Sequence, residues 1–155
     1  MASLNDERHG HPQSTVKIAG HPLHPMLVQF PIVCFILTLV FDILYTRGQT
    51  DVARWTIWLL GIGLAMGALA AVAGLTDFLG EKRIQGSDAI KHAVANVTAV
   101  VLEVVNLILR LKSTDSIGST GVYISLVVVL ILLYSGWKGG DLVYRHGMGV
   151  NDSAP

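Results

Sequence analysis

Four long apolar runs, separated by short polar segments, dominate the pattern of the chain. Each run is long enough to cross a bilayer as a helix, which takes about 20 residues. A helix also satisfies its own backbone hydrogen bonds in lipid, where water is absent. We therefore predict an all-α fold, an integral membrane four-helix up-down bundle, with spans at about residues 25–45, 53–79, 89–111 and 122–137.

Polar sequence lies on both sides of these runs. Residues 1–19 lack apolar periodicity and are predicted to form a polar, mobile N-terminal tail. The membrane domain then covers residues 20–150, and residues 151–155 are predicted to be a loose C-terminal end. This division predicts a single membrane domain without a separate water-soluble core.

The first run begins with two His-Pro pairs, His21-Pro22 and His24-Pro25. Proline disfavours helical geometry in the residue before it. Pro25 is well suited to be the first helical residue, because its missing N–H would have no partner there. We therefore predict that His24 is the N-cap of the first span and that His21 lies just outside the helix.

In three of the predicted helices, five residues that include polar or small ones fall on one shared face, at about 100° per residue. In the second span the shared face includes a GxxxG, which permits close packing of another helix or of a flat ligand. In the third span the polar face must point into the bundle, because polar side chains are costly against lipid. The three faces consist of His24, Pro31, Phe35, Thr38 and Asp42; of Gly63, Gly67, Ala70, Gly74 and Asp77; and of His92, Asn96, Glu103, Asn106 and Arg110.

Local signals also predict where the later helices begin and end. Ser87 or Asp88 is a natural N-cap for the third span. Several glycines follow the fourth apolar run, so this helix is predicted to end near Trp137. The segment Tyr144-Arg145-His146 is then predicted to fold over the membrane surface.

Composition supports a membrane protein and excludes some partners. Of the 155 residues, 52% are hydrophobic and only 14% are charged, whereas a soluble domain carries about 25% charged residues. The mean hydropathy is +0.56 and the net charge is zero, so we predict a lipid bilayer as partner and no nucleic acid. Cys34 is the only cysteine, which excludes an internal disulfide.

Basic residues predict the orientation, since they are enriched in cytoplasmic segments. Seven lie in the tails and the second connector, against four at the other membrane face. Both termini are therefore predicted to be cytoplasmic. In this arrangement one rim of the bundle collects the polar residues His21, His24, Asp77, His92, Asn96, Trp137 and His146.

We predict a cofactor site at this rim. His24 and His92 come from helices that are diagonal neighbours in such bundles, and they could supply both axial ligands of haem b. Asp77 could orient a ligating imidazole, the glycine face could admit the macrocycle, and His21, Asn96 and His146 complete the predicted cofactor-binding set. Metal ligation is assigned to His24 and His92.

Three alternatives stay open. His21, His24, His92 and Asp77 could hold zinc or copper. The polar face of the third span could relay protons from His92 through Asn96 to Glu103. The chain could also be a structural or assembly subunit without a cofactor. Signatures of hydrolases and nucleotide-binding enzymes are absent, and the sequence leaves an enzymatic activity undecided.

Two motifs carry a resemblance to a known family. The opening His21-Pro-Leu-His-Pro-Met-Leu-Val28 with Phe30-Pro31, and the ending Gly136-Trp-Lys-Gly-Gly-Asp-Leu-Val-Tyr144 with Gly147-Met-Gly-Val150, are similar to motifs of an uncharacterised bacterial membrane family. That family is catalogued as domain of unknown function 2231. Residues of its middle part resemble Ala73, Gly74, Asp77, His92 and Asn96, so the resemblance covers residues 19–150.

The resemblance implies a four-helix protein of the bacterial inner membrane. Some members are joined to Rieske-type domains, which implies quinol-linked or haem-linked electron transfer with a redox protein or a quinone as partner. Many members have a histidine where this chain has Gln29, and a ligand at that position would change the predicted ligand set. Neither the residues nor the resemblance decides whether the chain forms homo- or hetero-oligomers.

Overall fold

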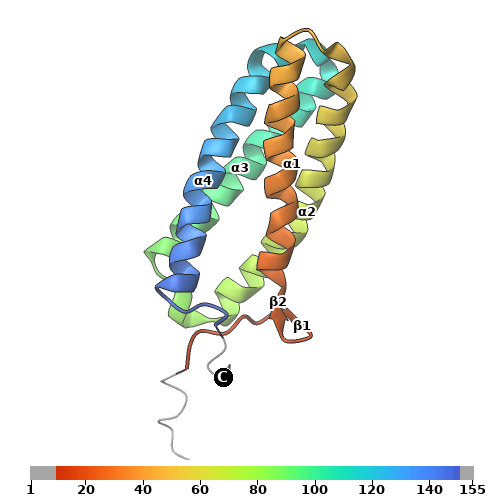
Figure 1. The fold of residues 1–155 in the computed structure, drawn as a ribbon. Helices are drawn as coiled ribbons and strands as arrows, with labels where there is room; N and C mark the ends of the chain where they lie inside the picture. The colour runs from red at the N-terminus through yellow and green to blue at the C-terminus, as the bar shows by residue number, and fades with distance from the viewer. Residues whose placement is uncertain (1–9, 151–155) are drawn as a thin grey trace, which may run out of the picture.

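A computed structural model describes residues 10–150, in which the four predicted spans form long helices that run up and down in a bundle (Figure 1). All four are long and apolar enough to cross a membrane, which confirms the predicted fold class. They are α1 (Leu23–Thr46), α2 (Ala53–Gly80), α3 (Ser87–Lys112) and α4 (Val122–Tyr144). Tight turns η2 (Thr50–Val52), η3 (Lys82–Ile84) and η4 (Thr114–Ser116), and a π-helical turn η5 (Ile117–Gly121), connect them.

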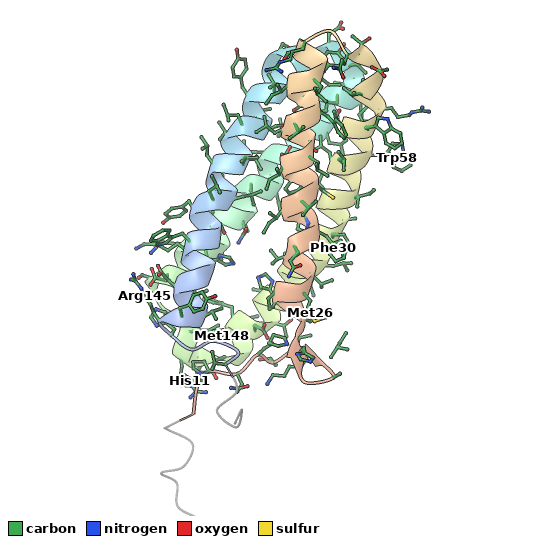
Figure 2. The ribbon with its side chains drawn as sticks, viewed as in Figure 1. His11, Met26, Phe30, Trp58, Arg145 and Met148 are labelled. Carbon is green, nitrogen blue, oxygen red and sulfur yellow. The ribbon has the colours of Figure 1, made fainter. Side chains whose placement is uncertain are left out.

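The bundle consists of two helical hairpins. Helix α1 packs most extensively on α2, and α3 on α4, whereas α1–α4 and α2–α3 contacts join the two hairpins. Helices α1 and α3 are therefore diagonal, as predicted. The chain enters and leaves at the same end of the bundle, where Met26, Arg145 and Met148 lie (Figure 2).

The outer surface is apolar and the middle of the interior is closely packed. Phe35, Leu60, Ala99 and Val128, one from each helix, form the buried cluster at the centre. Large apolar side chains such as Trp58 point away from the bundle (Figure 2). Such a surface requires lipid around it, and it accounts for the bilayer predicted as partner.

The glycine face of α2 packs on α1. A Cβ atom on Gly63 would lie 2.6 Å from Cε1 of Phe35 and 3.0 Å from Cβ of Cys34, and one on Gly67 would lie 3.7 Å from Cβ of Pro31. These glycines therefore allow two backbones to approach closely. Of the two predicted uses of this face, close packing of another helix is the one seen at Gly63 and Gly67. Helix α1 leaves no room for a macrocycle at these two positions.

Two predicted N-caps are wrong. Helix α1 begins at Leu23 with Pro22 as its N-cap, so His24 lies inside the first turn. The N–H groups of that turn have no intrahelical acceptor, and Pro25 therefore fits there as well as at the first position. Helix α3 begins at Ser87 with Gly86 as its N-cap and without a side-chain cap. Both predicted caps therefore lie inside its first turn, where Asp88 accepts a hydrogen bond from Lys138 of α4 at 3.0 Å.

The predicted end of α4 is also wrong. The helix continues beyond Trp137 and ends at Tyr144, so Tyr144 is helical, whereas Arg145 and His146 lie in the turn that follows it. Glycine in a helix costs about 1 kcal/mol relative to alanine. Gly139, however, makes room for the ring of His92, because a Cβ atom at position 139 would lie 3.1 Å from Cε1 of that ring. Asp141 also stabilises this last turn, because it accepts from Lys138 at 2.9 Å and pairs with Arg145 at 3.1 Å.

Candidate functional site

His24 is held against α2 at the end of the bundle where the chain enters. Its Nδ1 lies 2.7 Å from the carbonyl oxygen of Ala70. Gly74, one turn further along α2, makes this approach possible, because a Cβ atom there would lie 2.8 Å from the same nitrogen. Any side chain at Gly74 would therefore displace the imidazole.

His92 is held against α4 in the same way. Its Nδ1 lies 2.9 Å from the carbonyl oxygen of Ser135 and 3.1 Å from the Ser135 hydroxyl. Gly139, again one turn after the accepting carbonyl, makes room for the ring. Each hairpin thus positions one histidine of its first helix with a carbonyl and a glycine of its second helix.

The two imidazoles meet across the bundle. Their ring centroids are 6.1 Å apart and their planes are nearly perpendicular, at 85°. We call His24 and His92 the histidine pair. A carbonyl oxygen only accepts hydrogen bonds, so each Nδ1 carries the proton and, in the neutral ring, each Nε2 carries a lone pair.

The two lone pairs have different surroundings. The Asn96 side-chain amide donates to Nε2 of His92 at 3.0 Å and to the His92 carbonyl oxygen at 3.0 Å. Nε2 of His24 has no hydrogen-bond partner within residues 10–150. Asn96 therefore contacts one of the two imidazoles directly.

Asp77 contacts the N-terminal segment and no imidazole. Its carboxylate accepts from the Ser14 hydroxyl at 2.9 and 3.0 Å, from the Thr15 N–H at 2.7 Å and from the Val16 N–H at 3.1 Å. The predicted role of orienting a ligand is therefore not seen, since both carboxylate oxygens are used by a different segment.

Residues 10–22, which we call the N-terminal strap, lie across this end of the bundle, although the sequence predicted a mobile tail as far as residue 19. Within the strap, β1 (Lys17–Ile18) pairs with β2 (His21–Pro22). Arg83 donates to the Gly10 carbonyl oxygen at 2.7 Å and to Glu81 at 2.7 and 3.0 Å. The hydrogen bonds from Arg83 lower the pKa of Glu81 to about 2. The predicted tail residues 1–9 and the loose end 151–155 lie outside the described residues.

The other predicted histidines lie apart from the pair. His21 is exposed on β2, and Nε2 of His146 lies 3.4 Å from Asp88. No hydrogen bond or ring contact joins either residue to the histidine pair in the described part of the chain. Across residues 10–150, no group of three or more His, Cys, Asp or Glu residues could hold a metal ion, so the ligand set predicted for zinc or copper is not assembled.

A second polar group lies at the opposite end of the bundle and is fully buried. Arg110 donates to both carboxylate oxygens of Asp42, at 2.6 and 2.7 Å, and to Asn106 at 2.9 Å. Ser125 donates to Asp42 at 2.7 Å, and Asn106 donates to Glu103 at 2.8 Å. We call these residues the distal polar cluster: Asp42, Glu103, Asn106, Arg110 and Ser125.

The histidine pair and the distal polar cluster are not connected by hydrogen bonds. Asn96 bonds within the first site and Glu103 within the second. Between them on α3 lies Ala99, which is fully buried in the central apolar cluster. A proton relay from His92 through Asn96 to Glu103 therefore has no continuous path among the described residues.

Comparison with known proteins assigns the family. The model of a family described as predicted membrane protein (DUF2231) matches residues 20–152. The chain belongs to the DUF2231 family. No curated protein and no solved structure matches the chain. With four candidate spans, this DUF2231 chain is a multi-pass membrane protein.

Two residue spacings repeat between the two hairpins of this DUF2231 chain, and the predictions from the sequence did not make use of them. His24 and Asp42 are 18 residues apart, and so are His92 and Arg110. Eighteen residues are about five helical turns, so both members of each set lie on one face. Ser135 and Gly139, which hold His92, likewise have the spacing of Ala70 and Gly74, and this second match could have identified them.

Proposed function

We propose that the histidine pair binds haem b and that the protein takes part in electron transfer within the membrane. The observation that carries the proposal is that each imidazole is fixed by its Nδ1 to a backbone carbonyl, at 2.7 Å for His24 and 2.9 Å for His92. Ligating histidines typically donate their other ring N–H in this way, which fixes both tautomer and ring orientation.

The separation of the rings suits two ligands of one metal centre. A bond between a metal ion and an imidazole nitrogen is about 2 Å long. Two such bonds, together with the distance from each ring nitrogen to the centroid of its ring, add up to a separation comparable with the 6.1 Å between the two centroids. The equivalent positions of His24 and His92 in the two hairpins also favour one shared ligand between them over two separate sites.

The surrounding residues fit a haem group under two conditions. The Asn96 amide must leave Nε2 of His92, which it now occupies at 3.0 Å. The macrocycle must then lie between the two hairpins, because α1 covers the glycine face of α2. The contacts between the hairpins are less extensive than those within them, so room for the group would come from a movement at this boundary, at the end of the bundle that holds the histidine pair. When bound, the group would supply one-electron chemistry.

Basic residues at the same end of the bundle would balance the charge of the acidic side chains of a haem group. Lys138 and Arg145 lie here, both currently paired with acidic residues of the rim. The excess of basic residues in the tails and the second connector of the sequence also favours a cytoplasmic position for both termini in a bacterial inner membrane. A quinone or a redox protein is the partner that such a site would require.

The visible spectrum of the purified protein, with and without dithionite, tests the proposal. After expression with haem supply, we expect a b-type spectrum that is lost in His24→Ala and in His92→Ala. His21→Ala and His146→Ala are matched controls that should keep it. A colourless wild-type protein would overturn the proposal in favour of a subunit without haem, and stoichiometric zinc or copper in that protein would assign the pair to a small metal ion.

A further inference from the structure

The carboxyl group of Glu103 is incompletely paired, although it is buried. The side chain is 0% exposed. Its Oε2 accepts from the Asn106 amide at 2.8 Å, but its Oε1 has no hydrogen-bond partner. Among the buried side-chain N and O atoms of residues 10–150, Oε1 is the only one without a partner. An unsatisfied buried oxygen of this kind requires an explanation.

The charges of the distal polar cluster do not balance if Glu103 is ionised. Arg110 carries one positive charge, and Asp42 already balances it through two short hydrogen bonds. Besides these two groups, α4 contributes only the hydroxyl of Ser125. The buried face of α2 has no ionisable group before Asp77 at the other end. An ionised Glu103 would therefore leave an uncompensated negative charge inside the bilayer, which is strongly unfavourable.

We propose that Glu103 is a proton-binding site and holds a proton on Oε1 at neutral pH. The proton makes the group neutral, so the cluster then contains one balanced ion pair and no net charge. Asn106 completes the arrangement, because it accepts from Arg110 at 2.9 Å and donates to Glu103 at 2.8 Å. This site is separate from the proposed haem site, since the central apolar cluster lies between them.

A proton fits this place better than a metal cation does. Hard cations take several oxygen ligands, about six to eight for calcium. Here both oxygens of Asp42, Oε2 of Glu103 and Oδ1 of Asn106 already accept hydrogen bonds. Oε1 of Glu103 is the only free carboxylate oxygen in the distal polar cluster, and a proton needs no more than one.

The π-helical turn η5 closes this end of the bundle. A Cβ atom on Gly121 would lie 3.2 Å from Oδ1 of Asn106 and 3.3 Å from Nη2 of Arg110. π-helical turns occur frequently at functional sites, and this one encloses the cluster. The enclosed position keeps water away from Glu103 and thereby favours its neutral form.

Infrared spectroscopy of the full chain in liposomes tests the proposal. Glutamate occurs at positions 7, 81 and 103, so the variant Glu7→Gln/Glu81→Gln leaves Glu103 as the only glutamate without changing the core. At pH 7 we expect the C=O band of one un-ionised carboxylic acid per chain. Carbon-13 in the glutamate side-chain carboxyl should shift this band, and Glu103→Gln should remove it.

Three outcomes would overturn the proposal. The first is the absence of an acid band at pH 7 in the variant with Glu103 as the only glutamate. The second is a band that the glutamate label does not shift, which would place the proton on an aspartate such as Asp42. The third is loss of the band when potassium is replaced by sodium, which would indicate a cation site. Because the labelled variant keeps Glu103, the test does not depend on the folding of Glu103→Gln.

Discussion

His24 and His92 occupy equivalent positions in two successive helical hairpins and meet with their ring centroids 6.1 Å apart. Eighteen residues later in the same two helices, Asp42 and Arg110 meet at 2.6 Å. The bundle therefore joins its two halves at both ends through residues of matching position. At one end the residues are identical, and at the other they carry opposite charge.

Replacing Asn96 tests whether its amide competes with a ligand for Nε2 of His92. If haem binds as proposed, Asn96→Ala removes a hydrogen bond worth about 1 kcal/mol, and haem affinity should stay the same or rise by about fivefold. Haem titration followed by absorbance measures this change. Thr98→Val is the control, because the Thr98 hydroxyl bonds only to its own helix at 2.8 Å. Loss of haem in Asn96→Ala, as expected for His92→Ala, would contradict a merely competing role.

The Asp42–Arg110 pair should show strong coupling. Removal of one partner leaves a buried charge alone, so Asp42→Asn and Arg110→Met should each lower the free energy of unfolding by about 3–5 kcal/mol. The double variant should lose less than the sum. Denaturant unfolding in detergent micelles, analysed as a double-mutant cycle, gives the coupling energy. Additive losses would show that the pair acts as two independent groups.

The partly exposed pair Glu81–Arg83 is the control for that cycle. Its arginine side chain is 45% exposed and its glutamate side chain 14% exposed, and ion pairs near the surface typically contribute about 0.2–1 kcal/mol. Glu81→Gln and Arg83→Met should therefore change stability little and show a small coupling. A coupling as large as that of Asp42–Arg110 would contradict the role assigned to burial.

Helical periodicity was sufficient to predict the four helices and the polar interior, but not where the fourth helix ends. Arg110, Glu103 and Asn106 face inwards as predicted, because lipid excludes polar groups from the outer face. The diagonal placement of His24 and His92 also followed from the up-down connectivity. These features depend on the 3.6-residue repeat and on the alternating direction of the spans, both of which the sequence contains.

Features that depend on contacts between distant segments could not be predicted in this way. Asp77 binds the N-terminal strap through two backbone N–H groups. Almost every residue type carries such a group, so the sequence does not indicate which of them Asp77 binds. Gly139 is compatible with a helix because His92 of another helix fills the space beside it. Local rules treat such a glycine as a break, since they do not include the partner helix.

Asp77 should control the order of the N-terminal strap. Asp77→Ala removes the acceptor of the Thr15 and Val16 N–H groups, which lie at 2.7 and 3.1 Å. Hydrogen bonds to charged groups contribute about 1.5–3 kcal/mol, so amide exchange in this segment should accelerate by about 10-fold or more. Hydrogen exchange measured by mass spectrometry checks this. Thr76→Ala is the control, because the Thr76 hydroxyl bonds only to Val72 at 2.8 Å, and equal exchange in all three proteins would refute the assignment.

Gly63 and Gly61 provide a matched pair for testing the α1–α2 contact. Gly63→Ala places a Cβ atom 2.6 Å from the Phe35 ring, and overpacking of this kind costs about 1–3 kcal/mol. Gly61 lies two residues before Gly63, and a Cβ atom added there meets nothing within 4 Å. Gly61→Ala should therefore stabilise the helix by up to about 1 kcal/mol. Unfolding in detergent micelles compares both with the wild type. The substitution is the same in both variants, so changes of opposite sign in the free energy of unfolding would assign the difference to the contact with Phe35. Equal changes would show that helix propensity alone determines stability at these positions.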